Sequence, residues 1–166
     1  MVNENPSAEM KKRPPRSFQP GRAAAICGVI VALTSLTGAL FPAGDWYGGL
    51  SKPPGTPPDF AFPLVWTALY IGMAMAAWRI WRRCGLGREL GLFVLQLLFN
   101  ALWMPVAFGW HSLGLALIVA VALWVTLAAT LRAFWQADRI AGLLLFPYAV
   151  WVSYVLYLNV GLLGLN

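Results

Sequence analysis

Long runs of apolar residues fill most of the chain, and polar, proline-rich or charged segments separate them. A helix needs about 20 apolar residues to cross roughly 30 Å of hydrocarbon, and each run reaches about that length. Because backbone groups cannot stay unpaired in lipid, such runs are expected to be helical. The pattern predicts an all-α integral membrane protein, a bundle of five transmembrane helices over residues 23–41, 62–81, 90–109, 112–135 and 140–163.

The composition supports a membrane protein and argues against a disulfide framework, a metal site and a phosphate-binding site. Of 166 residues, 60% are hydrophobic and only 11% are charged, too few charges to cover a water-soluble domain. Two cysteines do not make a disulfide framework, and the single histidine, His111, falls in a short turn. No metal-binding or phosphate-cradling motif is present, so we expect no metal, no cofactor and no nucleic acid partner.

The basic residues are placed unevenly along the chain. Eleven of the twelve fall before the first run or in the links after the second and fourth runs, and only Lys52 falls in the other links. By the positive-inside rule, this predicts a cytoplasmic N-terminus and an outer C-terminus if the membrane is a bacterial inner membrane. Residues 1–22 are expected to be a disordered basic tail that can touch anionic lipid, and residues 23–166 the transmembrane domain.

The segment over residues 42–61 is the long outer loop of this scheme. It is rich in proline and glycine, which favour turns and stiff extended pieces over regular helix. Trp46, Tyr47 and Phe60 lie in it, and Phe62 follows. Two interpretations stay open: the aromatic residues anchor the loop at the membrane interface, or the loop is a lid over a pocket.

One carboxamide lies in the middle of the third apolar run. Helical spacing puts Gln96, Asn100, Trp103 and Ala107 on one stripe. A buried amide needs hydrogen-bond partners, so this stripe should face other helices. The amide either joins helices, at about 0.6 to 2 kcal/mol per bond, or lines a ligand cavity.

Two further helices carry aromatic stripes. Trp66 and Tyr70 share a face of the second span, and Tyr148 and Trp151 share a face of the fifth. Such stripes are often simple packing, but buried Trp and Tyr also want a hydrogen-bond partner. Together with the third span they predict a flat apolar pocket with a few polar points, which suits a planar aromatic ligand.

Several motifs in this order resemble the translocator protein family, also called the tryptophan-rich sensory protein or peripheral benzodiazepine receptor family. The motifs are DWYGGLSKP followed by PP, then FPLVWTALY, FNALWMPVAFG and PYAVWVSYVLYLN. The resemblance covers about residues 41–159. It implies a five-helix bundle with a pocket open towards the long loop, and binding of porphyrins such as protoporphyrin IX and haem. It also implies a homodimer and a link to tetrapyrrole metabolism.

The resemblance carries over to individual residues where the motifs match. Trp66 and Trp151 match two tryptophans tied to porphyrin breakdown in bacterial relatives, and would be catalytic only if such breakdown occurs here. Tyr47 matches a loop aromatic that covers the ligand, and Asn100 matches a pocket amide. The predicted ligand-binding set is completed by neighbours of these positions: Trp46, Tyr70, Gln96, Trp103 and Tyr148.

Two positions depart from the family pattern. In KPPGTPP, Gly55 stands where the family usually has a bulky aromatic, so the lid is expected to be looser, or its contact to pass to Trp46 or Phe60. The C-terminal segment YLNVGLLGLN has no basic residue after its tyrosine, which the family's sterol-associated motif requires. Sterol binding through that motif is therefore not expected.

Three functions follow from the sequence in order of preference. The first is a membrane receptor or sensor for porphyrins. The second is light-dependent degradation of protoporphyrin, for which indoles are the visible oxidisable groups. The third is transport, although no internal repeat and no buried ion-coupling residue is visible in the spans.

Overall fold

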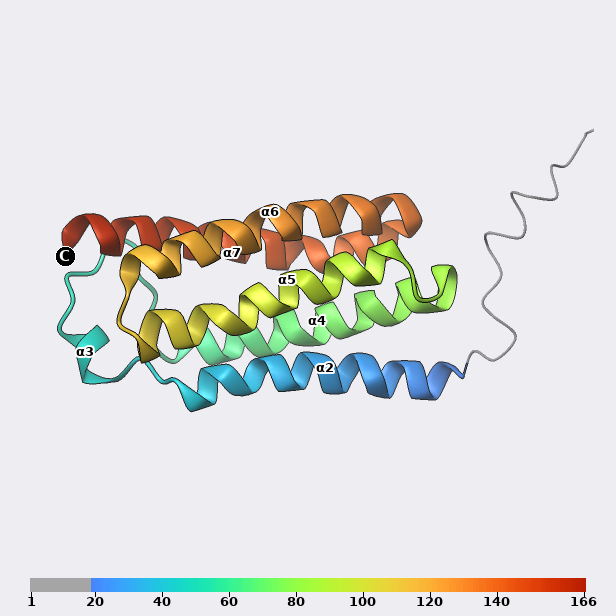
Figure 1. Cartoon of the computed structure of the whole chain (residues 1–166), viewed down its shortest axis with the longest axis horizontal. Coiled ribbons are helices and arrows are strands. Elements are labelled where there is room, and N and C mark those ends of the chain that lie inside the picture. Colours follow the sequence, from blue (N-terminus) through green and yellow to red (C-terminus); the bar gives the residue numbers. More distant parts are fainter. Residues whose placement is uncertain (1–18) are drawn as a thin grey trace, which may run out of the picture.

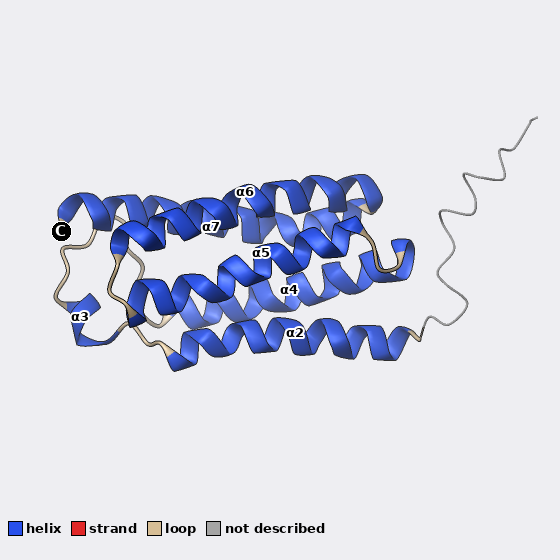
Figure 2. Ribbon diagram, in the orientation of Figure 1, coloured by secondary structure: helices blue, strands red, loops and turns tan. Residues whose placement is uncertain are grey.

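The structure, a computed structural model, describes residues 19–166 and is a bundle of long helices (Figure 1). No strand occurs among these residues (Figure 2), and a short helix, α3 (Gly44–Gly48), lies in the long loop. Five helices are long and apolar enough to cross a membrane. They are α2 (Pro20–Leu40), α4 (Ala61–Cys84), α5 (Arg88–Met104) continued by the π-helix η1 (Pro105–Gly109), α6 (Leu113–Ala137) and α7 (Arg139–Leu165). The predicted five-span membrane bundle is confirmed.

The boundaries differ from the expected ones by a few residues. Of the tail expected over residues 1–22, residues 1–18 lie outside the described part of the chain. The rest of it differs from the expectation, because α2 already begins at Pro20. Helix α4 continues to Cys84, about one turn beyond the expected end at residue 81. Arg82 and Arg83 are tolerated in that last turn because long basic side chains reach from a helix end to the headgroups.

Local interactions explain where α4 ends and where α7 begins. Helix α4 ends at Gly85, whose φ of +72° is readily available only to glycine. Helix α7 begins after Asp138, whose carboxylate accepts hydrogen bonds from the backbone N–H groups of Ile140 and Ala141. This is an N-cap, and it satisfies two of the donors that a helix start leaves unpaired.

Pro105 changes the winding of the third span. The proline has no N–H to donate, and the chain widens there into the π-helix η1. The Trp110 N–H donates to the Pro105 carbonyl at 2.9 Å, a bond of the i→i+5 type. The third span therefore ends in one wide turn, in which Val106 and Ala107 are buried.

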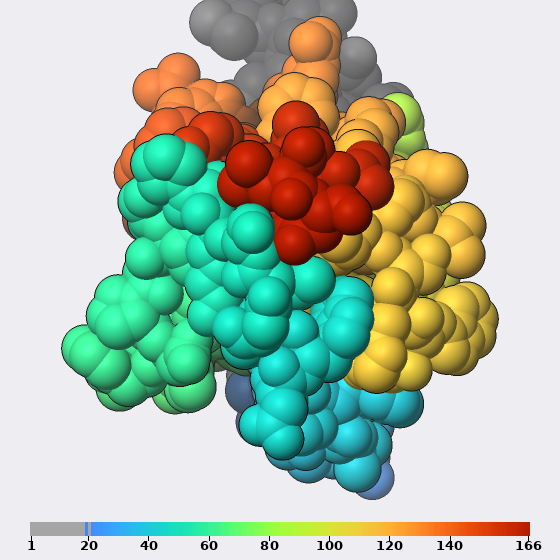
Figure 3. All heavy atoms as spheres, turned by 90° about the vertical axis from the view of Figure 1, so that its left-hand side faces the viewer, coloured from blue at the N-terminus to red at the C-terminus, as the bar shows by residue number. Residues whose placement is uncertain are grey.

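The two halves of the bundle are filled differently. Buried apolar residues from all five spans pack together in the half next to the α6–α7 turn, and Met73, Ile80, Phe134 and Leu145 are almost completely buried there. The other half, next to the 42–61 loop, is closed at its end by that loop, which lies beside the C-terminus of α7 (Figure 3). The packed half therefore holds the helices in place, and the loop half is free to enclose a cavity.

Candidate functional site

A cavity of about 550 Å³ lies in the loop half of the bundle. Its walls come from all five spans and from the 42–61 loop. Most of the lining is apolar or aromatic, and the volume falls in the range of about 300–1,000 Å³ that is usual for small-molecule sites.

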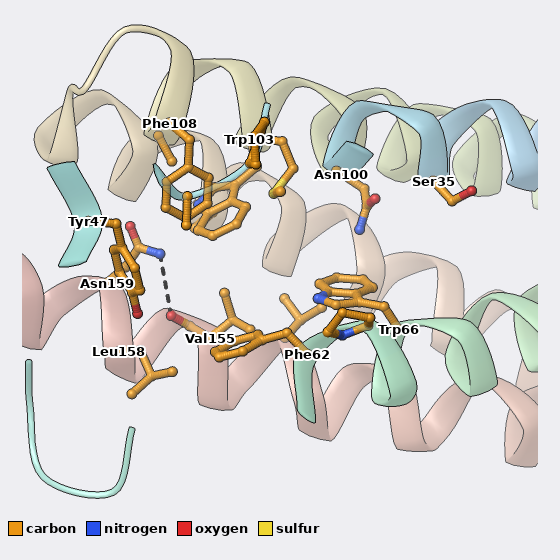
Figure 4. Close-up of a pocket in the computed structure, with 18 of the residues that line it drawn as sticks. Ser35, Tyr47, Phe62, Trp66, Asn100, Trp103, Phe108, Val155, Leu158 and Asn159 are labelled. Carbon is orange, nitrogen blue, oxygen red and sulfur yellow. Dashed lines mark hydrogen bonds between the residues drawn. The ribbon is translucent and has the colours of Figure 1, made fainter. Parts of the chain in front are cut away.

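Aromatic side chains face one another across this cavity (Figure 4). Trp103 and Phe108 lie on one side, Trp66 and Phe62 lie on the other, and Tyr47 stands at the loop end. The Trp103 and Phe108 rings meet edge to face, with centroids 5.5 Å apart, and the Tyr47 ring meets Phe108 in the same way. The site is therefore a slot between aromatic walls.

A chain of hydrogen bonds runs from the inner end of the cavity into the core. The Tyr70 hydroxyl donates to Asn100 Oδ1, Asn100 Nδ2 donates to the Tyr148 hydroxyl, and that hydroxyl donates to Gln96 Oε1, each over 2.9 Å. Asn100 lines the cavity and also bonds α5 to both α4 and α7. Asn100 therefore joins helices and is also a polar point in the cavity wall, and that this cavity binds a ligand stays a prediction.

Three buried donors have no hydrogen-bond partner among residues 19–166. They are Gln96 Nε2, Trp103 Nε1 and Trp151 Nε1. A buried donor without a partner costs free energy. Trp103 lines the cavity, but its indole nitrogen is one of these buried atoms.

The 42–61 loop is attached to the outer part of α7. The Tyr154 hydroxyl donates to the Gly55 carbonyl, and the Tyr157 hydroxyl donates to the Pro54 carbonyl at 3.1 Å. Pro53 is buried against Gly161, so closely that a Cβ on residue 161 would lie 2.6 Å from the Pro53 Cβ. The loop therefore lies over the cavity as a docked lid.

The structure gives a reason for the departure at Gly55. Its φ of +85° is a conformation that other residues rarely adopt, so an aromatic side chain would be strained in this loop. Neither Trp46 nor Phe60 replaces the missing aromatic: Trp46 stacks on His111 with ring centroids 4.3 Å apart, and Phe60 is largely exposed. The expectation that Trp46 or Phe60 takes over the contact is wrong. Instead, the hydroxyls of Tyr154 and Tyr157 on α7 hold this part of the loop.

Charged groups stand at the mouth of the cavity. The Lys52 ammonium lies 4.6 Å from the centroid of the Tyr47 ring, and Asp59, also in the 42–61 loop, lines the cavity. Burial, with a smaller contribution from the Asp59 carboxylate, raises the pKa of Tyr47. The Tyr47 hydroxyl therefore stays protonated and neutral at physiological pH.

The predicted site residues separate into two groups in the structure. Five line the cavity: Tyr47, Trp66, Tyr70, Asn100 and Trp103. Four do not, namely Trp46, Gln96, Tyr148 and Trp151. Gln96 and Tyr148 are fully buried behind the inner wall, where they hold Asn100. Trp151 contacts the edge of Phe62, whose ring lies between α4 and α7, with centroids 5.9 Å apart.

Sequence reasoning missed two contributions to the wall. Helix α2 supplies Ser35, Gly38 and Ala39, small residues that give no strong pattern but leave room beside them. Asn159 is the second amide that lines the cavity; it is buried in α7 and donates to the Val155 carbonyl at 3.4 Å (Figure 4). The signal that identified Asn100, an amide in an apolar run, was also present at Asn159.

Comparison with known proteins assigns the family. Residues 23–164 match the model of the TspO/MBR family. The chain is 42% identical over 142 residues to a tryptophan-rich sensory protein of Cereibacter sphaeroides, covering 86% of this chain and 87% of that protein. It is 34% identical over 136 residues to the human translocator protein, covering 77% of this chain and 80% of that protein. The chain is a multi-pass membrane protein that belongs to the TspO/MBR family.

Proposed function

We propose that the chain is a membrane receptor that binds planar tetrapyrroles, protoporphyrin IX or haem, in the cavity of the loop half, and that it acts in their regulation or transport. The observation that carries this proposal is the aromatic slot itself, about 550 Å³ in volume, with Asn100 at its inner end. Flat aromatic ligands gain contact area and offset stacking between such walls. The names of the relatives, sensory protein and translocator, are consistent with a receptor or a carrier.

The charges at the mouth favour one direction of entry. A porphyrin with two propionates carries its charge on one edge, and an aromatic slot without a basic lining residue is a poor place to bury that charge. We propose that the apolar edge enters first and meets Asn100 and the ring of Trp103. The propionates then stay at the mouth, within reach of the Lys52 ammonium and close to the Asp59 carboxylate.

Trp66→Ala should weaken protoporphyrin IX binding about tenfold or more. The indole lines the slot and stacks on Tyr70 with centroids 5.4 Å apart, so its removal takes away a wall and its aromatic contacts. Quenching of tryptophan fluorescence during titration of the detergent-purified protein measures the affinity. Trp110→Ala is the matched control, because Trp110 is 69% exposed and does not line the cavity. Equal affinities for the two variants would place the ligand elsewhere.

Asp59→Asn should strengthen binding of protoporphyrin IX roughly threefold to tenfold, because a like charge near the propionates is removed. The dimethyl ester of the same porphyrin has no propionate charge, so its affinity should not respond to the substitution. Asp45→Asn, in the same loop but outside the cavity lining, is the control for net charge. If the free acid and the ester responded alike, the propionates would not lie at this mouth.

Light-dependent porphyrin breakdown is the alternative function of the same cavity. Trp66 stands in the wall, whereas Trp151 is separated from the lining by its edge contact with Phe62. A reaction that needs both indoles against the macrocycle would require Phe62 to move. Porphyrin that bleaches under illumination faster with the protein than with detergent alone would favour this alternative over a receptor.

We also propose that the arginine-rich end of the bundle faces the cytoplasm. Within the described residues, seven of eight basic side chains lie at that end, in or near the first and last turns of the spans. Basic residues near span ends are retained on the cytoplasmic side. The cavity mouth and the 42–61 loop would then face the opposite compartment.

A further inference from the structure

The end of the bundle opposite the lid carries a concentration of positive charge. Between residues 19 and 166, the acidic residues at this end are Glu89 and Asp138, which leaves an excess of five positive charges. Because these side chains stand where the spans end, they lie at the depth of lipid headgroups. The arginines are Arg22, Arg79, Arg82, Arg83, Arg88, Arg132 and Arg139.

Asp138 is already saturated with hydrogen bonds. Its Oδ1 accepts from the N–H groups of Ile140 and Ala141, at 2.9 and 3.4 Å. Its Oδ2 accepts from Arg79 Nε at 3.1 Å and from Arg79 Nη2 at 2.9 Å. A carboxylate offers about four lone-pair positions, and here all four are used. The acid therefore neutralises Arg79 and has no acceptor left for a second arginine.

Arg83 is the second arginine beside Asp138, and it forms only a long ion pair with that carboxylate. Its Nη1 lies 4.0 Å from Asp138 Oδ2, beyond hydrogen-bond distance, and its side chain is 52% exposed. Its guanidinium is thus held near the corner where α4 meets the α6–α7 turn, with its donors free for another acceptor. A planar guanidinium with free donors suits the oxygens of a phosphate.

Two further arginines are chain neighbours of this ion pair, Arg82 next to Arg83 and Arg139 next to Asp138. Arg82, the neighbour of Arg83, is held over the ring of Trp78 with its Cζ 4.7 Å from the ring centroid. Arg139 is exposed and follows Asp138 directly in the chain. The Trp135 ring packs against Gly142 beside them and is 44% exposed, as expected of an aromatic at the membrane interface.

We propose that this corner, defined by Arg82, Arg83 and Arg139, binds the phosphate of an anionic phospholipid. The lipid is favoured over a soluble phosphate because the guanidinium groups stand at headgroup depth beside interfacial tryptophans, with exposed apolar helix surface leading away from them. This corner is built by the packed half of the bundle, so it does not depend on the cavity or on its ligand.

The test is lipid binding to the detergent-purified full chain, followed by native mass spectrometry. The probes are dioleoyl phosphatidylglycerol and dioleoyl phosphatidylcholine, which share their acyl chains and differ in charge. The wild type should bind the first lipid more tightly. In the variant Arg82→Gln, Arg83→Gln, Arg139→Gln this preference should fall at least tenfold, since the planar guanidinium donors that would bind the phosphate oxygens are removed.

The control variant Arg22→Gln, Arg88→Gln, Arg132→Gln removes the same charge from the same end and should keep most of the preference. If both variants lost the same share of the lipid preference, the positive charge would act as a diffuse field and not as a binding site. The proposal would also be overturned if the wild type showed no preference between the two lipids. Inorganic phosphate that competes as strongly as the lipid would show a soluble-anion site instead. If the glutamine variant does not fold by circular dichroism, the triple lysine variant replaces it, and it should lose selectivity while keeping its charge.

Discussion

Asp138→Ala should lower the unfolding midpoint of the protein in detergent by roughly 5–12 °C. The substitution removes the N-cap of α7, worth about 1 kcal/mol, and leaves the Arg79 guanidinium without its acceptor. Because the Arg79 side chain is 33% exposed, water compensates part of that loss, and we expect about 2–4 kcal/mol in total. Thermal melting followed by circular dichroism measures the change, with about 2–4 °C per kcal/mol for a chain of this size.

Two variants and a pH series separate the contribution of the α7 N-cap from that of the Asp138 charge. Asp138→Ser keeps a capping oxygen but no charge, so it should lose only part of the stability, and Asp45→Ala, at an exposed position, should lose almost none. Burial raises the pKa of Asp138, but the bonds from Ile140, Ala141 and Arg79 outweigh it, and the net pKa is lowered. The stabilisation is therefore complete above the unfolded pKa of about 3.9 and disappears as the pH falls through the lower folded value. A melting curve of Asp138→Ser with the same acid dependence as the wild type would contradict this assignment.

Gly161→Ala should make a bound porphyrin dissociate about ten times faster. The added methyl group would lie 2.6 Å from Pro53 Cβ and 2.8 Å from Pro53 Cγ, so the docked lid must shift away from α7. Overpacking of this kind usually costs about 1–3 kcal/mol, and here the cost falls on the closed position of the loop. Stopped-flow recovery of tryptophan fluorescence, after transfer of the ligand to an excess of acceptor protein, measures the rate.

Gly164→Ala is the matched control for this experiment. It adds the same methyl group to the same helix three residues later, where nothing lies within 4 Å. Its dissociation rate should equal that of the wild type. If both variants, or neither, released the ligand faster, the contact between Pro53 and Gly161 would not hold the lid closed.

Hydrophobic patterning was sufficient to predict the five spans and the inward face of Asn100. It placed Asn100 inward, because an amide in hydrocarbon must find partners, and the structure supplies Tyr70 and Tyr148. Periodicity gives the direction of a side chain around the helix axis but not what lies beyond it. Gln96 shares the Asn100 stripe, one turn nearer the packed half, and there the space is filled by Tyr148 and not by a cavity.

The remaining part of the site depends on contacts between distant segments. Tyr154, Tyr157 and the loop carbonyls that they reach are about a hundred residues apart, so no local pattern connects them. Trp151 was expected to line the pocket from its position on α7. Instead Phe62, which comes from α4, lines the cavity and Trp151 contacts its ring, and no pattern within α7 could reveal that.

The division of the bundle into a packed half and a hollow half has a consequence for divergence between related chains. In the packed half, the loss of one methylene group destabilises the whole protein, so few substitutions can be accepted there. In the hollow half, a larger or smaller wall residue changes the shape of an empty space, and the helices stay where the other half holds them. New molecular preferences can therefore arise in this architecture by single substitutions that leave folding intact.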